Sequence, residues 1–380
     1  MLNNPTLSLA RQPRGLIQVS GRDAKGNTMP ATKIAGWMNF EVNNNVFYEA
    51  DTFRITFSIS GLPIANNEAW WASQKEIFVE LFAGFPSNPE VYGANDLQSL
   101  TYGRVDDITY NPVARTLEVS GRDLTAAMID TKTTEKFQNL TASQIAINVA
   151  NRHGLTPVVT ATKLKVGKYY QLDQNKMNVQ RSEWDLLTGL AQEESFNVYV
   201  KGKTLHFEPQ PLPNVNPYVL RFIAPTANSN AYALNAISLN FSRALNLARG
   251  VVVIVNSHSM KTGKNISVKF PSKSITIRPG ESAPTAQVYA YKFASMDYEK
   301  ALKKAQQIHA DITQHEVKLS AELPADTILS VANLIQVIGT NTSFDQNYYP
   351  ESITREMSME SGYKMQITAK NNSPQSIVPL

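Results

Sequence analysis

The chain has 380 residues, of which 42% are hydrophobic and 18% charged, and this composition indicates an ordered protein of two or three domains. The formal net charge of +4 is too small, and the basic residues are too scattered, to predict a nucleic-acid-binding protein. Because cysteine is absent, disulfides and thiolate metal sites are excluded. The sequence has no apolar run long enough for a membrane helix and no apolar secretion signal, so membrane insertion is not expected.

Residues 1–29 are predicted to form an N-terminal arm with one possible strand, Leu16–Ser20. Proline and glycine separate the basic side chains of this segment, which indicates a solvated arm. These basic residues are Arg11, Arg14, Arg22 and Lys25.

Strand signals dominate residues 30–124, which are predicted to form a first β domain. The clearest signal lies in Ala50–Gly61, where Phe53, Ile55 and Phe57 alternate with polar residues, as in a half-buried strand. Further short strands are expected at Lys33–Val42, Ile77–Phe82, Gly103–Tyr110 and Arg115–Val119. This spacing of short strands predicts an antiparallel barrel or sandwich.

The end of this β domain carries the tripeptide Gly121-Arg122-Asp123. Gly121 permits a bend in the chain, and Asp123 is well placed to cap the turn that opens at Leu124. We therefore expect Arg122 and Asp123 to fix the domain junction through hydrogen bonds rather than to contact a ligand.

Residues 125–212 are predicted to form a small α/β domain. A capping box of Thr141 and Gln144 begins one helix, and Gly154 ends it. Ser182 and Asp185 repeat the capping signal for a second helix. The two runs Phe196–Val200 and Thr204–Phe207 are expected to form a hairpin, and a proline-rich linker follows.

Residues 213–370 are predicted to form a second β domain, with one helix at residues 295–313 packed against it. Residues 371–380 are expected to form a loose tail. The strands expected in this domain are Ala236–Phe241, Gly250–Asn256, Asn265–Phe270, Glu316–Ala321, Ile328–Ile338 and Ile353–Thr368.

A search for catalytic or metal-binding patterns gives no candidate site. Asp106 and Asp107 are adjacent in a predicted strand, where neighbouring side chains point to opposite faces. His309 and His315 diverge on a continuous helix, so that Glu316 does not complete a metal site with them. The motifs of acyl transfer and nucleotide binding are also missing. We therefore predict no catalytic residue, no metal and no cofactor.

Trp70 and Trp71 form the most conspicuous aromatic pair. They are interpreted either as an interface anchor, because tryptophan is favoured in desolvated hot spots, or as a lock that holds a loop over the first β domain. The sequence leaves both interpretations open.

The order of these features resembles the baseplate hub proteins of contractile-tailed phages. The resemblance rests on Asp51-Thr52-Phe53, on Gly103-Arg104-Val105-Asp106 and on Gly121-Arg122-Asp123-Leu124-Thr125, followed by the capped helices and the terminal β domain. The set is similar to Mu-like hubs, to late control protein D of P2-like phages and to the N-terminal part of type VI secretion spike proteins. The resemblance implies a mainly β chain with α+β inserts, in which two similar antiparallel β-barrel tube domains accompany the small α/β domain.

The same resemblance implies a structural, non-enzymatic role in the virion, at the tail baseplate. Three chains would supply six barrels in a pseudo-hexameric ring that joins the six-fold tail tube to the three-fold central spike. The expected partners are therefore two further copies of the chain, the tail tube protein, the spike protein and other baseplate proteins, with DNA only as passing cargo. The alternatives are a tail-associated cell-wall hydrolase and a carbohydrate-binding β protein.

Overall fold

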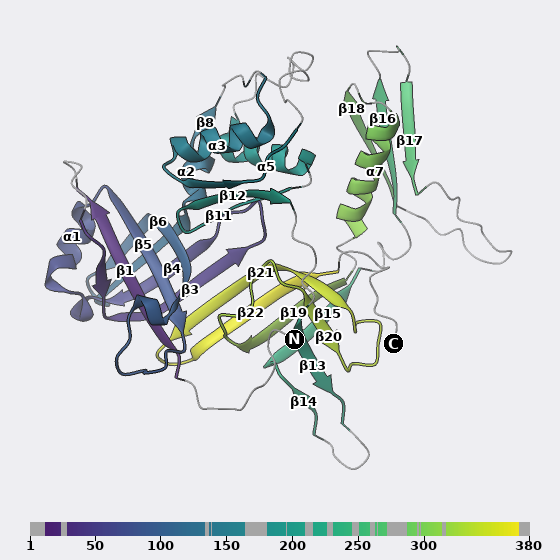
Figure 1. The fold of residues 1–380 in the computed structure, drawn as a ribbon. Helices are drawn as coiled ribbons and strands as arrows, with labels where there is room; N and C mark the ends of the chain where they lie inside the picture. Colours follow the sequence, from purple (N-terminus) through teal and green to yellow (C-terminus); the bar gives the residue numbers. More distant parts are fainter. Residues whose placement is uncertain are drawn as a thin grey trace.

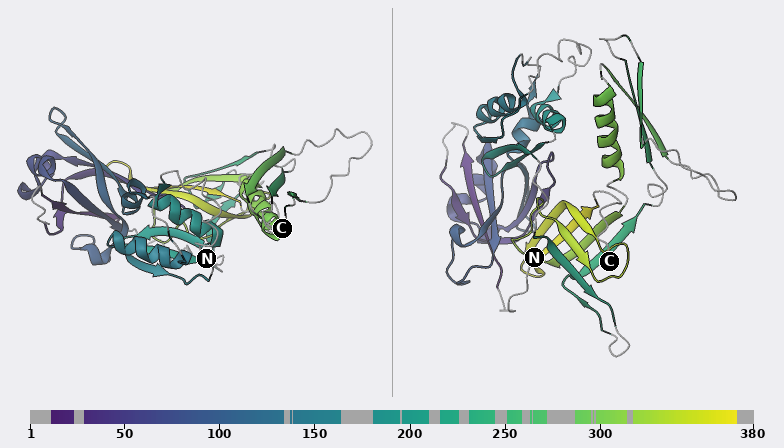
Figure 2. Two further views of the ribbon diagram at one scale, coloured as in Figure 1. Left: turned by 90° about the horizontal axis from the view of Figure 1, so that it is seen from above. Right: turned by 45° about the vertical axis from the view of Figure 1, so that its right-hand side comes forward.

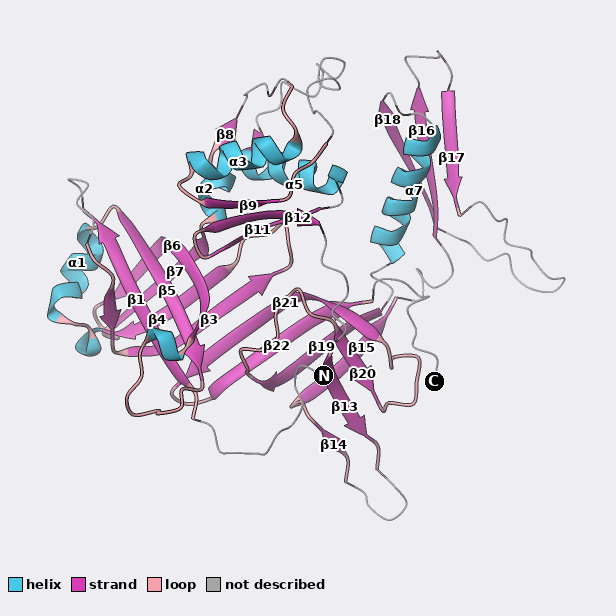
Figure 3. Ribbon diagram, viewed as in Figure 1, coloured by secondary structure: helices cyan, strands magenta, loops and turns pink. Residues whose placement is uncertain are grey.

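The computed structural model describes residues 12–23, 29–133, 137, 139–163, 181–194, 196–209, 216–225, 231–244, 251–258, 263, 265–271, 287–294, 296, 298–313 and 317–371. The described chain is mainly β and consists of two β modules, an α/β unit and an insert of three strands and one helix (Figure 1, Figure 3). Parts of the predicted arm, at 1–11 and 24–28, and residues 372–380 of the predicted tail at 371–380 lie outside the described residues, whereas Asn371 is buried and bonded to Val317.

The first β module is a seven-stranded antiparallel sheet in the order β2-β1-β5-β6-β7-β4-β3. Its strands are β1 (Arg14–Arg22), β2 (Thr32–Ile34), β3 (Trp37–Asn45), β4 (Thr52–Ser58), β5 (Glu76–Gly84), β6 (Gln98–Asn111) and β7 (Thr116–Asp123). Its connections contain η1 (Ile59–Gly61), η2 (Ile64–Asn66), α1 (Glu68–Ser73) and η3 (Ala94–Asp96). As the alternation predicts, Phe53, Ile55 and Phe57 of β4 are buried.

Strand β1 corrects the prediction of a solvated N-terminal arm. It is longer than the expected strand and pairs with β5 over nine residues, from Arg14 opposite Gly84 to Arg22 opposite Glu76. Leu16 and Ile17 are buried in the core. The apolar side chains of this short segment were enough to bring it into the sheet, although proline, glycine and arginine flank them.

The α/β unit follows the first module. It contains α2 (Thr125–Asp130), β8 (Lys132–Thr133), α3 (Ala142–Arg152), β9 (Thr156–Val159), β10 (Arg181–Ser182), α5 (Glu183–Glu194), β11 (Phe196–Lys201) and β12 (Thr204–Pro209). The predicted capping boxes are confirmed: Thr141 exchanges hydrogen bonds with Gln144, and Ser182 with Asp185. Gly154 adopts φ +67°, as a helix-ending glycine should. Strands β11, β12 and β9 form a small sheet beneath α3 and α5.

The second β module comprises β13 (Tyr218–Ile223), β14 (Ala233–Leu234), β15 (Ser238–Arg243), β19 (Val317–Pro324), β20 (Ile335–Ile338), β21 (Asn347–Ser358) and β22 (Gly362–Lys370). The expected strand at residues 328–338 is thus shorter, and the one expected at residues 353–368 is a hairpin. Between β15 and β19 lies the insert, formed by β16 (Val251–His258), β17 (Asn265–Phe270), β18 (Gln287–Ala294) and the expected helix, α7 (Tyr298–Thr313).

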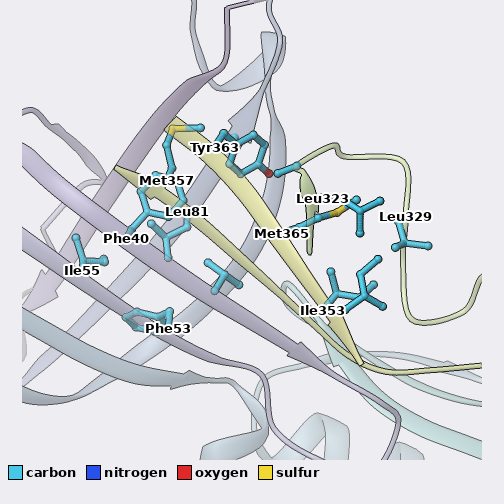
Figure 4. Close-up of a cluster of buried hydrophobic side chains, with 14 of the residues drawn as sticks. Phe40, Phe53, Ile55, Leu81, Leu323, Leu329, Ile353, Met357, Tyr363 and Met365 are labelled. Carbon is cyan, nitrogen blue, oxygen red and sulfur yellow. The ribbon is translucent and has the colours of Figure 1, made fainter. Parts of the chain in front are cut away.

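Strands β3 and β21 pair in antiparallel register and join the two modules into one 14-stranded sheet. This sheet ends on open edges, so the described strands do not close into either of the two predicted barrels. The second half of β21, beyond its pairing with β20, is occupied by β3 of the other module. The core follows the same continuity, because Phe40 and Ile55 lie in one hydrophobic cluster with Ile353, Met357 and Met365 (Figure 4).

The second module repeats the strand order of the first. Its order is β14-β13-β20-β21-β22-β19-β15, and each strand matches its counterpart in the order β2-β1-β5-β6-β7-β4-β3. The pairings are antiparallel in both modules, except that β13 runs parallel to β20 whereas β1 runs antiparallel to β5. The insert interrupts only the second module, between the counterparts of β3 and β4.

A local detail strengthens the correspondence between the modules. Both β6 and β21 contain a β-bulge, with Asp106 and Glu351 as the extra residues. Each bulged carboxylate forms an ion pair with a basic residue of the next strand: Asp106 with Arg122 at 2.6 Å, and Glu351 with Lys370 at 3.0 Å. These matches define a register in which Arg122 corresponds to Lys370.

Candidate assembly site: the seam and the free sheet edges

The tripeptide at the end of β7 lies where the first module passes into the α/β unit. Arg122 binds both carboxylate oxygens of Asp106, and these hydrogen bonds raise the pKa of Arg122. It also reaches Asp130 at the end of α2, which accepts a 2.7 Å hydrogen bond from Arg104. A side chain at Gly121 would come within 2.1 Å of the Arg104 carbonyl oxygen, so glycine allows β6 and β7 to pack closely here.

Asp123 is buried beside a second carboxylate, that of Asp51. Its side chain accepts a hydrogen bond from the backbone N–H of Thr125, which begins α2, and its own N–H donates to the Asp51 carbonyl. Burial raises the pKa of Asp51 to about 6, and burial together with the charge of Asp51 raises the pKa of Asp123 to about 8. Asp123 is therefore protonated at neutral pH in the folded chain.

The raised pKa of Asp123 predicts a pH-dependent stability. A carboxyl group whose pKa is higher in the folded state favours folding at low pH, and this contribution is lost as the pH rises toward 8. The wild-type unfolding free energy should decrease as the pH rises from 5.5 to 8.5. In Asp123→Asn, which keeps the acceptor for Thr125, we expect this decrease to be smaller by roughly 2 kcal/mol. Urea unfolding of both proteins at the two pH values measures the difference, and parallel pH profiles would contradict it.

A buried polar network holds the seam between β3 and β21. Arg355 of β21 is 4% exposed and donates to the backbone carbonyls of Asp326 and Leu329 and to the side-chain oxygen of Asn44 on β3. Asn44 in turn donates to the Asp51 carboxylate at 2.8 Å and to a carbonyl of β6. Through Arg355, Asn44 and Asp51, this network connects β21 of the second module with β3 and β6 of the first.

The α/β unit is attached at the same end of the sheet. Tyr48, just beyond β3, donates its hydroxyl and its backbone N–H to carbonyls of β11, and its own carbonyl accepts a hydrogen bond from the indole of Trp184. Within the unit, the buried carboxylate of Glu183 contacts Arg152 and His153. His153, at the C-terminal end of α3, therefore has a buried carboxylate as its side-chain partner.

The tryptophan pair lies on α1, over the first module. Trp71 is buried, and its ring packs 5.6 Å from that of Phe57, while Trp70 meets it edge-on at 5.2 Å. An interface role does not fit Trp71, because its side chain already fills the core of its own module. Trp70 is half-buried, and for this residue an interface role remains a prediction.

The residues examined for catalysis do not converge in the described parts of the chain. Asp106 is held in its bulge by Arg122, and Asp107 is exposed on the outer face of the sheet. His309 lies against Phe270, whereas His315 and Glu316 are outside the described residues. Among the described residues we find no group suited to hold a metal ion and no helix with the length and hydrophobicity for a membrane crossing.

One free edge of the large sheet is the second half of β6. Strand β5 pairs with β6 only as far as Arg104, so residues 105–111 have β7 on one side and no described strand on the other. Ile108 and Tyr110 in this segment are 38% and 48% exposed. Their counterparts in the second module, Ile353 and Arg355, are 0% and 4% exposed; β3 pairs along this part of β21, and Arg355 also contacts the loop at Asp326 and Leu329.

Another free edge belongs to β15, whose described partner is β19 alone; the short strands β2 and β14 at the ends of the sheet also have one described partner each. In the register of the two modules β15 is the counterpart of β3, with Phe241 corresponding to Val42 and Ser242 to Asn43. The second half of β6 is thus the counterpart of β21 but lacks a strand in the place of β3. Strand β15 is the counterpart of β3 but lacks a strand in the place of β21.

The face of the sheet that points away from the core is polar along its central strands. Its residues are serine, threonine, asparagine, glutamine or charged residues of both signs, which leave little apolar surface for adhesion. They include Thr52, Arg54, Thr56 and Ser58 on β4, Ser352, Thr354, Glu356 and Ser358 on β21, and Lys364, Gln366, Thr368 and Lys370 on β22.

Sequence reasoning identified Gly121, Arg122 and Asp123 but missed Asn44, Arg355 and the free edges. The Asp-Thr-Phe motif at residue 51 was noted without a role for its carboxylate. A signal for Arg355 did exist, because an arginine stands at an inward position of an alternating strand between Ile353 and Met357.

Comparison with solved structures shows what this geometry is similar to. A tail protein from Neisseria meningitidis MC58 superimposes with a TM-score of 0.64 at 14% identity, over 96% of this chain and 99% of that one. The 43 kDa tail protein of prophage MuSo2 from Shewanella oneidensis gives 0.62 at 14% identity, over 96% and 100%. This chain has the fold of phage tail proteins.

A secretion-system protein has a similar fold. A component of the type VI secretion system of E. coli, itself similar to T4 bacteriophage tail proteins, gives a TM-score of 0.50 at 11% identity, over 91% of this chain and 76% of that one. No family model matches the sequence, and no curated protein matches it. The resemblance to phage tail and type VI spike proteins is thus confirmed at the level of the fold.

Proposed function

We propose that this chain is the structural baseplate hub of a phage tail or related particle. Three copies form a pseudo-hexameric ring that joins a six-fold tail tube to a three-fold central spike, within the virion. The single observation that carries the proposal is the repeated strand order of the two β modules, since two like modules in each of three chains present six similar units. The domain boundaries expected from the sequence, near residues 124 and 212, belong to the same proposal.

The seam inside the chain provides the template for the contact between chains. At the seam, β21 pairs with β3; their counterparts, the free half of β6 and β15, have matching open edges. Carrying the seam register over places Thr109 of one copy opposite Ser242 of the next, and Tyr110 opposite Phe241. This contact is head-to-tail, and such contacts generate rings when the rotation closes.

The polar face of the sheet suits the inner wall of this ring. Strands β15, β19, β22 and β21 continue directly into β3, β4, β7 and β6, so each copy would contribute an unbroken polar strip. Because the strip carries carboxylates beside its lysines and small hydroxyl side chains, it offers a hydrated surface without a basic track that would retain DNA. DNA is thus proposed as passing cargo rather than as a ligand.

A disulfide trap tests the ring and its register together. The natural chain has no cysteine, so Thr109→Cys combined with Ser242→Cys introduces the only two thiols. Under oxidising conditions we expect a closed covalent trimer on denaturing gels, because the two positions face each other only across neighbouring copies. The matched control, Thr109→Cys with Ser238→Cys, shifts the second thiol by four residues and should remain uncross-linked.

Light scattering of the wild-type protein, alone and with its spike, complements the trap. A trimer is expected, and a protein that remains monomeric in both conditions and gives no cross-link would overturn the hub proposal. The two alternatives, a cell-wall hydrolase and a carbohydrate-binding protein, gain no specific support from the described residues. Both would leave the edges of β6 and β15 unpaired.

A further inference from the structure

The two modules lie side by side in the views of Figure 1 and Figure 2, and β3 and β21 join them. Within this seam Arg355 stands opposite Val42, but its guanidinium reaches diagonally across to Asn44 at 3.1 Å. Asn44 stands opposite Ile353, two residues away along β21. Diagonal neighbours of this kind are within reach of long side chains in an antiparallel pair. The seam thus contains one buried arginine, which the second module supplies.

The same diagonal position on the two free edges is occupied by a tyrosine and an arginine. In the register of the two modules, Tyr110 of β6 is the counterpart of Arg355, and Arg243 of β15 is the counterpart of Asn44. Both Tyr110 and Arg243 are exposed in the single chain. If β15 of one copy pairs along β6 of the next, the guanidinium of Arg243 would lie diagonally opposite the Tyr110 ring. An arginine over the face of a tyrosine is a favourable cation–π contact.

The placement of the two arginines distinguishes correct from incorrect pairing of the edges. Strands β21 and β6 are counterparts, and so are β3 and β15, so either strand of the first kind has the geometry to pair with either of the second. Pairing β15 with β21 would place Arg243 diagonally opposite Arg355, and such like charges repel each other. Pairing β3 with β6 would bring Asn44 and Tyr110 together without a cation. Each contact receives one arginine when a first module always meets a second module.

The distribution of charge along the chain favours the same pairing. Residues 209–280, which include β13 to β17, contain no aspartate or glutamate, so the edge of β15 lies in a segment whose charged side chains are all basic. In residues 1–124, by contrast, acidic residues outnumber basic ones, and the free part of β6 carries the exposed Asp107. Opposite charges on the two edges promote their association and disfavour contacts between like edges.

We infer that Arg243 of one copy and Tyr110 of the next form a contact that selects the alternating order of the modules. The inference rests on the proposed function and adds the residue pair that determines which edges of neighbouring copies pair. Arg243 is therefore a specificity-determining residue, because its charge is accommodated beside Tyr110 and is repelled beside Arg355.

The test measures the dissociation constant between copies of the full chain by analytical ultracentrifugation, in the condition, alone or with the spike, in which the wild type associates. Arg243→Asn should weaken association about tenfold, because the cation–π contact is lost. Tyr110→Arg places a second arginine diagonally opposite Arg243, and we expect association to be weaker by at least about a hundredfold. Circular dichroism establishes that each variant is folded.

The decisive variant combines Tyr110→Arg with Arg243→Asn and so reproduces the arginine and asparagine of the internal seam. Its dissociation constant should return to within about tenfold of the wild-type value. The matched control Arg221→Asn changes another exposed arginine of the carboxylate-free segment and should associate normally. A combined variant as weak as Tyr110→Arg, or a Tyr110→Arg variant that associates like the wild type, would overturn the inference while the ring still stands. A wild-type chain that does not associate in either condition would instead remove the proposed function.

Discussion

Replacing Ile108 and Tyr110 by aspartate is expected to convert the proposed trimer into a folded monomer. Both side chains are partly exposed in the single chain, while their counterparts on β21, along which β3 pairs, are buried. If β15 of a neighbouring copy pairs along β6, the two side chains become buried. Each then contributes about 1–2 kcal/mol to the free energy of association at each interface between copies. Two carboxylates at this position must instead be desolvated, which costs more than the lost apolar contact.

Light scattering measures the mass of this variant, and circular dichroism and thermal unfolding report whether it is folded. A matched control is Ile147→Asp on α3, which changes a similarly exposed aliphatic residue far from both edges. That control should remain trimeric. If the double variant keeps the wild-type mass, the register carried over from the seam is incorrect.

Arg355→Ala is expected to produce the largest loss of stability among single substitutions at the seam. The guanidinium, on a side chain of a residue that is 4% exposed, donates to two carbonyls of one loop and to Asn44 of the other module. Its removal leaves these acceptors without a donor and opens a cavity between the modules. We expect a decrease of about 3–5 kcal/mol in the unfolding free energy, measured by urea denaturation.

The nearby pair of Lys364 and Glu322 provides the comparison. Its atoms are 3.6 Å apart and both side chains are substantially exposed, so Lys364→Ala should cost less than about 1 kcal/mol. Arg355→Met, which fills the space without donating hydrogen bonds, separates the contribution of packing from that of the polar network. An Arg355→Ala variant as stable as Lys364→Ala would show that the seam does not depend on this network.

The local sequence determined those features that depend on residues close together in the chain. Alternation of Phe53, Ile55 and Phe57 with polar residues predicted β4, because a strand exposes every second side chain to the same face. Thr141 with Gln144 and Ser182 with Asp185 predicted the two helix starts, since the hydrogen bonds of a capping box span only three residues. The apolar face of α7 predicted that helix in the same way.

The features that connect the two β modules arise from pairs far apart in the chain, so local patterns could not predict them. The pairing of β1 with β5, the seam between β3 and β21, and the contact of Arg355 with Asn44 each join distant segments, and each depends on a register that only the whole sheet fixes. The raised pKa of Asp123 likewise reflects burial beside Asp51, which the folded sheet alone creates. The sequence by itself determined the strands, helices and caps; the tertiary structure decided which edges of the described strands were paired and which remained unpaired.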